Sequence, residues 1–402
     1  MTTPPDTSRF PLGRLILLAA AGFLTMLTET IPAGLLPGIG RSLNAGDAAT
    51  GQLLTAYAGA SMLAAIPLVV ATGRVPRKAL IIATITGVAI ANLITALSPV
   101  FWLAFAARVL GGAAAALQWA ILAGYAMRLV GQDRQGRALS IAMGGIPLAL
   151  AVGVPLGTFL GEVFDWRTVF GTITVIGLLL AALGMRALPS VPQTNTVSRP
   201  PWAALRIPGI VALLIGAGAF QLGHMNLYTY VAPYLTAQGE PLPLSAFLLT
   251  VGIAAIAGLF LTGIIIDRHL RLVALAAMGT FLTGMLLLTI STQPAVMIVA
   301  AIVWGLGLGA SPTVFQTACA RVAGTQVDQA QSLLVTIFNA GMALGSAIGG
   351  LLLAQLGTPV GLSGISGAIF AGIIALLLLT GRRSLPAHAA SLDSDDEERT
   401  NR

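Results

Sequence analysis

Long apolar runs recur along the whole chain and are separated by short polar segments. Each run has about 20 residues or more, the length that an α-helix needs to cross a bilayer. The runs are continuous rather than alternating, which favours helices over the strands of a β-barrel. The pattern predicts an all-α polytopic membrane protein with twelve spans, at 12–36, 51–72, 79–97, 100–127, 138–161, 168–188, 208–235, 244–266, 272–291, 294–318, 330–355 and 361–381.

One longer polar break divides these spans into two sets of six. The stretch 189–207 is rich in proline and carries basic residues, which is typical of a linker. We therefore expect an N-terminal six-helix bundle over 1–188, a cytoplasmic linker over 189–207, and a C-terminal six-helix bundle over 208–381. The acidic end, 382–402, is predicted to be a disordered cytoplasmic tail.

The two halves look like repeats of each other. Pro37 and Pro233 end the first and seventh spans, and the same number of residues separates Gly153 from Gly349. Both halves begin on the same side of the membrane. The sequence therefore predicts a parallel repeat, related by an axis along the membrane normal.

Charge placement sets the orientation. Hydrophobic residues make up 56% of the chain and charged residues 9%, against about 25% charged in soluble proteins. The net charge is +7, yet all lysines and arginines except Arg41, Arg108 and Arg167 fall in the N-terminus, the even-numbered loops and the C-terminus. The positive-inside rule then places both termini in the cytoplasm, and the basic residues orient the chain rather than bind nucleic acid.

Several kinds of chemistry are excluded by composition. Lys78 is the only lysine and lies outside any G-x-x-x-x-G-K-[ST] pattern, so this chain has no P-loop for ATP. Cys319 is the only cysteine, which excludes an internal disulfide and a cysteine metal cluster. No metal and no cofactor is predicted.

Three strongly ionisable side chains lie well inside spans: Glu29, Arg108 and His224. Glu29 and Arg108 each lie about 12 Å from the nearer helix end, and His224 about 17 Å, so the three share one layer. Such residues are costly in hydrocarbon and point to function. One interpretation is a buried ion pair between Glu29 and Arg108. The other is that Glu29 carries a proton, and that Arg108 changes its proton affinity by approaching in one state only.

Candidate substrate contacts surround this layer. Gln221, His224 and Tyr228 fall on one helix face at three- and four-residue spacing. Trp119 lies on the same face as Arg108, eleven residues later, and an aromatic wall there would stack a sugar or a flat drug. Further polar or aromatic candidates are Asn226, Trp304, Gln316 and Asn339.

Glycines recur at four-residue spacing in two predicted spans. Such stripes let two helix backbones approach closely. They fit either tight packing or helices that slide against the opposite half during alternating access, and Pro155 lies among them. The stripes are Gly153, Gly157 and Gly161 in the fifth span, and Gly341, Gly345 and Gly349 in the eleventh.

Four motifs carry a resemblance to a known family. They are "TETIPAGLLPGI" (28–39), the pattern Arg108-x-x-x-Gly112-x-x-x-Ala116, "GGIPLALAVGVPLGTFLG" (144–161) and "GHMNLYTYVAPYL" (223–235). Together they resemble the major facilitator superfamily over essentially the whole chain. The match is to its twelve-helix drug:proton antiporter branch, nearest the sugar-efflux and arabinose-efflux type permeases.

The resemblance implies roles for particular residues. It implies that Arg108 takes part in proton coupling and that the first, fourth and seventh helices line a central cavity. The family's loop motif G-x-x-x-D-R-x-G-R-K departs here, because Gly73 replaces its aspartate. The basic residues Arg74, Arg77 and Lys78 remain, and the second half keeps Asp267, Arg268 and Arg271, which the resemblance marks as conformational residues.

These observations predict a secondary transporter rather than an enzyme. We expect a proton-coupled exporter of a small polar or amphiphilic molecule, such as a sugar, nucleoside or drug, that works by alternating access. The alternatives are a proton-independent importer or uniporter and, from another class, an intramembrane enzyme, such as a hydrolase. The expected partners are a small-molecule substrate, protons and the lipid bilayer. The expected protein is a monomer in the bacterial cytoplasmic (inner) membrane.

Overall fold

The computed structural model describes residues 10–130, 134–190, 201–239 and 242–384. Within these ranges every regular element is a helix, so the predicted all-α fold is confirmed. The first half comprises α1 (Leu12–Ser42), α2 (Asp47–Ala71), α3 (Arg77–Leu97), α4 (Phe101–Arg128), α5 (Gln135–Met143), α6 (Gly145–Leu148), η2 (Ala149–Gly153), α7 (Val154–Val163) and α8 (Trp166–Ala187). The remainder comprises η3 (Pro201–Arg206), α9 (Ile210–Tyr228), α10 (Val231–Ala237), α11 (Leu244–Ile290), α12 (Pro294–Ala323), η4 (Gly324–Gln326), α13 (Val327–Leu356) and α14 (Gly361–Ser384).

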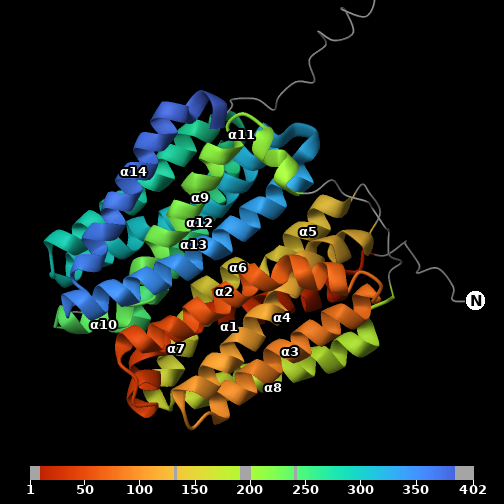
Figure 1. Ribbon diagram of the computed structural model, residues 1–402, viewed down its shortest axis with the longest axis horizontal. Helices are drawn as coiled ribbons and strands as arrows, with labels where there is room; N and C mark the ends of the chain where they lie inside the picture. The colour runs from red at the N-terminus through yellow and green to blue at the C-terminus, as the bar shows by residue number, and fades with distance from the viewer. Residues whose placement is uncertain (1–9, 131–133, 191–200, 240–241, 385–402) are drawn as a thin grey trace, which may run out of the picture.

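The two halves lie side by side as two helical bundles. Figure 1 shows the first half, from red to yellow, against the second half, from green to blue. The blue α13 runs along the orange-red α2, and these two helices are in contact along the seam between the halves. Within each half, the first long helix is central: α1 packs on α2, α4, α5, α7 and α8, and α9 packs on α12, α13 and α14.

Eleven helices in the described residues are long and apolar enough to cross a membrane. They match eleven of the twelve predicted spans. The remaining predicted span, 51–72, coincides with α2, which is long enough at 25 residues but is not one of the eleven. The predicted linker falls partly outside the described residues, at 191–200, as does the predicted tail from residue 385 on.

Two predicted spans are interrupted rather than continuous, and a proline follows the break in each. The predicted span 138–161 contains the five-residue π-helix η2, directly before Pro155. The predicted span 208–235 breaks between α9 and α10, just before Pro233. Proline has no backbone N–H to offer the carbonyl four residues earlier, so the helix loses one hydrogen bond there, although α1 continues through Pro32 and Pro37.

Two other predicted spans, 244–266 and 272–291, join with almost no loop. Both lie in α11, whose 47 residues contain a single non-helical residue, His269. A straight helix of that length would extend about 70 Å, more than twice the roughly 30 Å hydrocarbon core of a bilayer. The chain must therefore fold back at His269.

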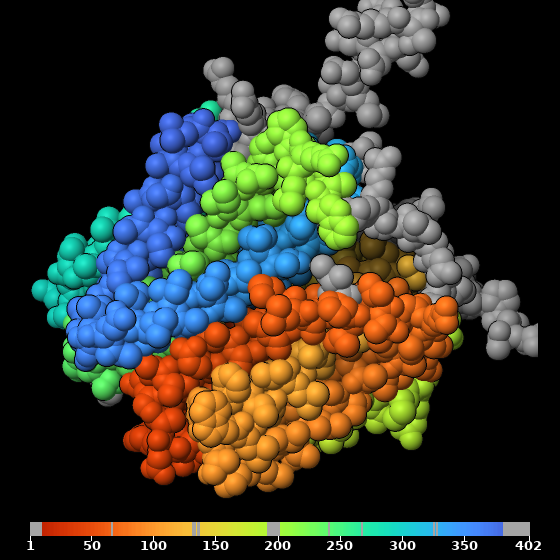
Figure 2. Space-filling model, in the orientation of Figure 1, coloured from red at the N-terminus to blue at the C-terminus, as the bar shows by residue number. Residues whose placement is uncertain are grey.

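Contacts between the halves gather at one end of the molecule, which we call the α1–α2 end because α1 ends and α2 begins there. The Gln52 side chain of α2 donates a hydrogen bond to the Tyr230 hydroxyl, 3.5 Å away, and Tyr230 donates to the Ser346 carbonyl at 2.9 Å. The Ser245 hydroxyl donates to the Glu162 carboxylate at 3.1 Å. In Figure 2 the seam between α2 and α13 is closed toward this end and widens toward the other, where α5 is visible at depth.

The glycine stripes do not face the opposite half, so the sliding interpretation is wrong for this conformation. A Cβ at Gly157 would meet Ile31 and one at Gly161 would meet Leu35, both on α1 of the same half. Gly341 and Gly345 approach the α9 backbone at Gly218 and Leu222 in the same way. Gly153 meets Phe23, and Gly349 meets Asn226 and Tyr230. The stripes let α7 and α13 lean on the central helix of their own half.

Close approach between the halves uses other glycines, which form no stripe in the sequence. A Cβ at Gly252 of α11 would lie 2.5 Å from the Ala151 Cα of η2. At the α1–α2 end, Gly51 packs against the Tyr230 ring, and Gly350 packs against Gln52 and Tyr230. Glycine is required at these positions because backbone or a rigid ring occupies the space of a Cβ.

Candidate functional site

Glu29 occupies the middle of the central helix α1 and is 7% exposed. It belongs to a buried polar row with Thr25, Thr28 and Thr30. The Asn92 amide of α3 donates to the Thr28 hydroxyl at 2.8 Å. The segment that looks apolar in sequence thus carries buried polar groups, of which Thr28 faces α3 of the same half and Thr30 faces the second half.

Arg108 of α4 approaches Glu29 but does not pair with its carboxylate. One guanidinium nitrogen, Nη2, donates to the Glu29 backbone carbonyl at 3.4 Å. The guanidinium lies over the Tyr57 ring, 4.3 Å from its centroid, and Nε has no hydrogen-bond partner. Both residues are described, and no ion pair within 4.0 Å joins them. The ion-pair interpretation is therefore not realised in this conformation, although the two charges still attract each other.

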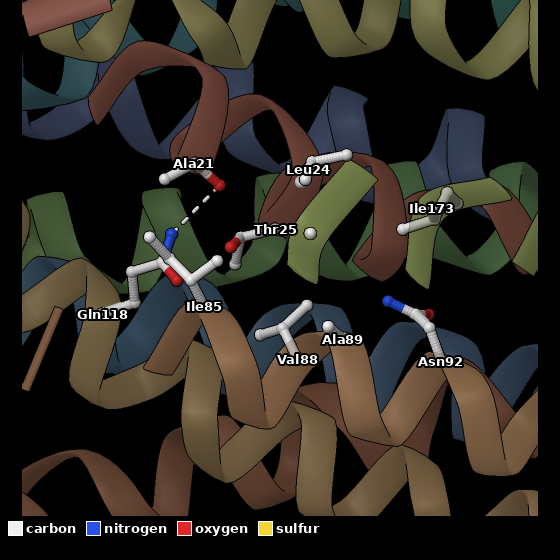
Figure 3. A pocket seen from close by; sticks show the side chains of 10 residues that line it. Ala21, Leu24, Thr25, Ile85, Val88, Ala89, Asn92, Gln118 and Ile173 are labelled. Atoms are coloured by element: carbon white, nitrogen blue, oxygen red, sulfur yellow. Dashed lines mark hydrogen bonds between the residues drawn. The ribbon is translucent and has the colours of Figure 1, made fainter. Parts of the chain in front are cut away.

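Three side chains donate hydrogen bonds to backbone carbonyls along one face of α1. Besides Arg108 on Glu29, Gln118 of α4 donates to the Ala21 carbonyl at 3.0 Å, and the Tyr57 hydroxyl donates to the Thr25 carbonyl at 3.5 Å. These carbonyls are four residues apart and so share a helix face. Figure 3 shows the Gln118 contact and the small cavity beside it, about 10 Å³ in volume, which Asn92 also lines. The cavity has room for about one water molecule.

A cavity of about 100 Å³ lies between the halves. From the second half, Gln221, His224 and Tyr228 line it, as their predicted common face requires. From the first half, Met26 and Thr30 of α1 face it, one turn apart. The other lining residues are Ile146, Leu150, Val154, Phe220, Met225, Leu248, Val251, Gly252, Leu308, Pro312 and Met342. Because ligand pockets usually measure about 300–1,000 Å³, a sugar-sized ligand requires the halves to separate further.

Five predicted substrate contacts do not line this cavity. Trp119 instead reaches the Glu29 carboxyl group with its side chain. Asn226 donates to the Leu362 carbonyl and to Ser366, so it ties α9 to α14. Trp304 donates a hydrogen bond to His224, and Asn339 donates one to the carbonyl of Val335 on its own helix. Gln316 is exposed.

The predicted conformational charges lie at the end opposite the α1–α2 end. Arg74, Arg268 and Arg271 are exposed, and Arg77 and Lys78 are half-buried at the start of α3. Asp267 belongs to α11, but its side chain lies outside what the structure describes. The conformational role of these residues stays a prediction.

A larger groove of about 640 Å³ opens at the α1–α2 end and was not predicted. It is lined by the ends of α1 and α7 on one side and by α10 and the start of α11 on the other. Arg41 and Glu162 give it charge of both signs, and Trp166 forms part of its wall. A signal was present, because Arg41 is one of the few basic residues on that side of the membrane.

The described residues contain no group of three or more His, Cys, Asp or Glu side chains able to hold a metal ion. Two helical halves that meet around a cavity, with a carboxyl group and a guanidinium buried in the first half, are typical of a polytopic membrane protein of the transporter class.

Comparisons with known proteins place the chain more narrowly. The family model described as Major Facilitator Superfamily matches residues 18–326 and 247–399. A "Probable sugar efflux transporter" of Helicobacter pylori (strain G27) is 28% identical over 386 residues, covering 94% of this chain and 97% of that protein. A protein of the same name from Haemophilus influenzae (strain PittGG) is 28% identical over 367 residues, covering 90% and 92%.

Solved structures agree on the fold. The inward-facing, unoccupied structure of a bacterial homolog of the human lysosomal transporter Spinster has a TM-score of 0.74 and 16% identity, covering 96% of this chain and 100% of that one. Its inward-facing, occupied form has a TM-score of 0.71. The chain belongs to the Major Facilitator Superfamily. It is a multi-pass membrane protein and a secondary transporter.

Proposed function

We propose that this protein is a proton-coupled exporter of a small polar or amphiphilic molecule, working by alternating access in the bacterial inner membrane with both termini in the cytoplasm. The substrate class is that of the relatives' names, sugars, extended to nucleosides and drugs. The observation that carries the proposal is the buried carboxyl group of Glu29, one residue before Thr30, which lines the cavity between the halves.

Coupling requires a proton site that responds to the conformation of the transporter. Arg108 holds the Glu29 carbonyl and leaves the carboxylate itself free of an ion pair in this conformation. If the guanidinium moves onto the carboxylate when the halves rearrange, it favours the ionised form and expels the proton. Arg108 cannot release a proton of its own, so it tunes the site and Glu29 carries the proton.

The asymmetry of the contacts between the halves supports alternating access. Gln52 with Tyr230, and Glu162 with Ser245, join the halves at the α1–α2 end. Under the positive-inside rule that end faces the periplasm, so this arrangement corresponds to a carrier that loads substrate from the cytoplasm.

The test is flux in proteoliposomes with an imposed pH gradient, using a panel of glycosides, nucleosides and drugs. The wild type should move substrate uphill against its gradient. Glu29→Gln keeps the size and hydrogen-bonding capacity of the side chain but cannot ionise, so it should bind and exchange substrate without gradient-driven accumulation. Asp165→Asn, which removes a carboxylate outside the central cavity, is the matched control and should accumulate substrate normally.

Other results of the flux experiment would contradict the proposal, and each would indicate a different activity or a different proton carrier. Flux that ignores the pH gradient indicates a uniporter or importer, and chemical change of the substrate indicates an enzyme. Unchanged gradient-driven accumulation by Glu29→Gln would show that another group carries the proton.

A further inference from the structure

His224 is held in a single orientation by aromatic neighbours. Its ring is parallel to that of Phe220, at 10° and 6.2 Å between centroids, and Trp304 meets it edge-on at 80° and 5.7 Å. Tyr228 and Phe281 complete the enclosure. With 4% of its surface exposed, the imidazole has little freedom to rotate.

One contact fixes which ring nitrogen carries hydrogen. The Trp304 indole nitrogen lies 3.2 Å from His224 Nδ1 and donates to it. An indole N–H is only a donor, so Nδ1 must be an acceptor without hydrogen. A neutral imidazole then carries its hydrogen on Nε2. An imidazolium would set two N–H groups against each other and lose this bond.

The other nitrogen is available to the cavity. His224 lines the cavity between the halves, whereas Trp304 does not. Nε2 lies across the ring from Nδ1, the nitrogen that the indole occupies. Among the described residues no protein acceptor is recorded for it. Nε2–H is therefore a donor that is fixed in place before any ligand arrives.

The rest of the cavity wall restricts the kind of ligand. None of the lining residues is charged, and an ionised ligand would lose its hydration there without compensation. Met26, Met225 and Met342 line it with flexible, polarizable side chains that adapt to apolar groups of varied shape. Beside His224, polar contacts come from Gln221, Thr30 and Tyr228.

We propose that Trp304 positions His224 as a permanent, uncharged hydrogen-bond donor that recognises an acceptor oxygen on an uncharged amphiphilic substrate, such as a glycoside with an apolar aglycone. The inference rests on the proposed function of this cavity as the substrate site. It makes His224 a specificity-determining residue and Trp304 a positioning residue. It also leaves proton carriage to Glu29, because a charged His224 would break the contact that holds it.

The first measurement is the tautomer itself, by ¹⁵N NMR on the full chain in lipid with labelled histidine. The chain has three histidines, and His224→Gln identifies the relevant signal by its loss. We expect an unprotonated Nδ1 and a protonated Nε2 throughout pH 5 to 8, the range in which an ordinary histidine titrates. Tyr228 is the one other titratable group among the described ring contacts of His224, and its hydroxyl keeps its proton in this range. Trp304→Phe keeps an aromatic ring but removes the donor, so the tautomer preference should disappear.

The second measurement is binding of phenyl β-D-glucoside, methyl β-D-glucoside and glucose. The phenyl compound should bind about tenfold more tightly than glucose, and both His224→Phe and Trp304→Phe should weaken its binding about tenfold, the value of one good hydrogen bond. Trp102→Phe, on the exposed start of α4, is the matched control and should change neither binding nor the NMR signal.

The outcomes separate the inference from the proposed function. Hydrogen on Nδ1, a titrating imidazolium, or unweakened binding by His224→Phe overturns the inference even when gradient-driven export persists. Failure of both glucosides and of glucose to bind likewise overturns it, and the flux panel then shows separately whether export of another substrate survives. If Trp304→Phe fails to fold, the tautomer of the wild type and the affinity of His224→Phe for the phenyl glucoside still test the inference.

Discussion

At the scale of single residues, the sequence predicts which polar groups matter better than it predicts what they touch. Glu29, Arg108 and His224 stand out because ionisable side chains are rare inside membrane spans. The structure buries all three side chains. The choice of carboxylate or carbonyl as the Arg108 partner depends on the rotation of α1 and α4 by a fraction of a turn. Periodicity does not fix rotation that finely.

A helical wheel already distinguishes some of the candidates. Gln221, His224 and Tyr228 share a face and do line the cavity together. Asn226 lies two residues from His224, on another side of α9, where it bonds to α14. Residues two apart on a helix do not face the same way, so this candidate was open to rejection from the sequence alone.

A prediction at this scale concerns the Tyr57 ring beneath Arg108. Tyr57→Leu removes the cation–π contact, which is worth up to about 2 kcal/mol when desolvated, and should lower thermal stability and impair transport. Tyr57→Phe keeps the ring and loses only the long hydroxyl contact to Thr25, so it should stay close to wild type. Thermal unfolding and gradient-driven flux measure both effects, and equal behaviour of the two variants would contradict the stacking argument.

Arg108→Lys belongs to the same comparison. An ammonium does not reproduce the planar guanidinium that both covers the ring and reaches the Glu29 carbonyl. We expect part of the transport activity to remain, whereas Arg108→Ala should abolish transport with the fold largely kept. Full activity of the Ala variant would remove Arg108 from the coupling scheme.

At the scale of helices, small residues decide how near two elements come. The sequence correctly indicates that the glycine stripes of α7 and α13 are packing surfaces, but spacing does not say which neighbour they face. The answer follows from the packing of each half, because α7 packs on α1 and α13 packs on α9. The glycines that meet across the seam, Gly51, Gly252 and Gly350, form no stripe and so gave no signal.

The prediction at this scale compares two glycines of α4. A Cβ at Gly112 would overlap the backbone of Tyr57 on α2, whereas nothing lies within 4 Å of a Cβ at Gly124. Gly112→Ala should therefore lower the free energy of unfolding by about 1–3 kcal/mol, the usual cost of overpacking. Gly124→Ala should raise it by up to about 1 kcal/mol through helix propensity. Thermal unfolding in the same detergent measures both, and a stable Gly112→Ala would contradict the described α2–α4 approach.

At the scale of the whole molecule, family and fold class follow from the sequence, and the conformational state does not. Twelve apolar runs, a polar midpoint and equal offsets between repeats predict the two-bundle architecture, and the family model matches the chain on both sides of the midpoint. The end at which the halves meet depends on a few side chains, such as Tyr230, whose partners lie on the opposite half. The same sequence must allow both arrangements if it alternates, so no pattern in it selects one.

The prediction at this scale loosens the α1–α2 end. Tyr230→Phe combined with Ser245→Ala removes the hydrogen bonds that Gln52 and Glu162 make to the second half. Leu248→Cys, introduced into a Cys319→Ala background, reports on access to the central cavity, which Leu248 lines. A membrane-impermeant thiol reagent added on the α1–α2 side should label it faster in the loosened protein.

The control for this experiment is Tyr125→Phe, which loses a hydrogen bond to the Pro189 carbonyl within a single half. It should leave the labelling rate unchanged. Equal labelling of the loosened and control proteins would show that these two contacts do not hold the halves together.

The fold-back at His269 has a consequence for how the protein is made. Nearly all of the residues between Leu244 and Ile290 are helical, so no extended tether separates the two spans of α11. During synthesis, the first of these spans cannot insert into the bilayer independently of the second, because a single non-helical residue separates them. The pair must enter as a single helical hairpin, with α12 arriving afterwards to cover it. Membrane insertion of the second half therefore adds two spans together at this point. A substitution in the five residues from Asp267 to Arg271 that alters the turn would misplace both spans.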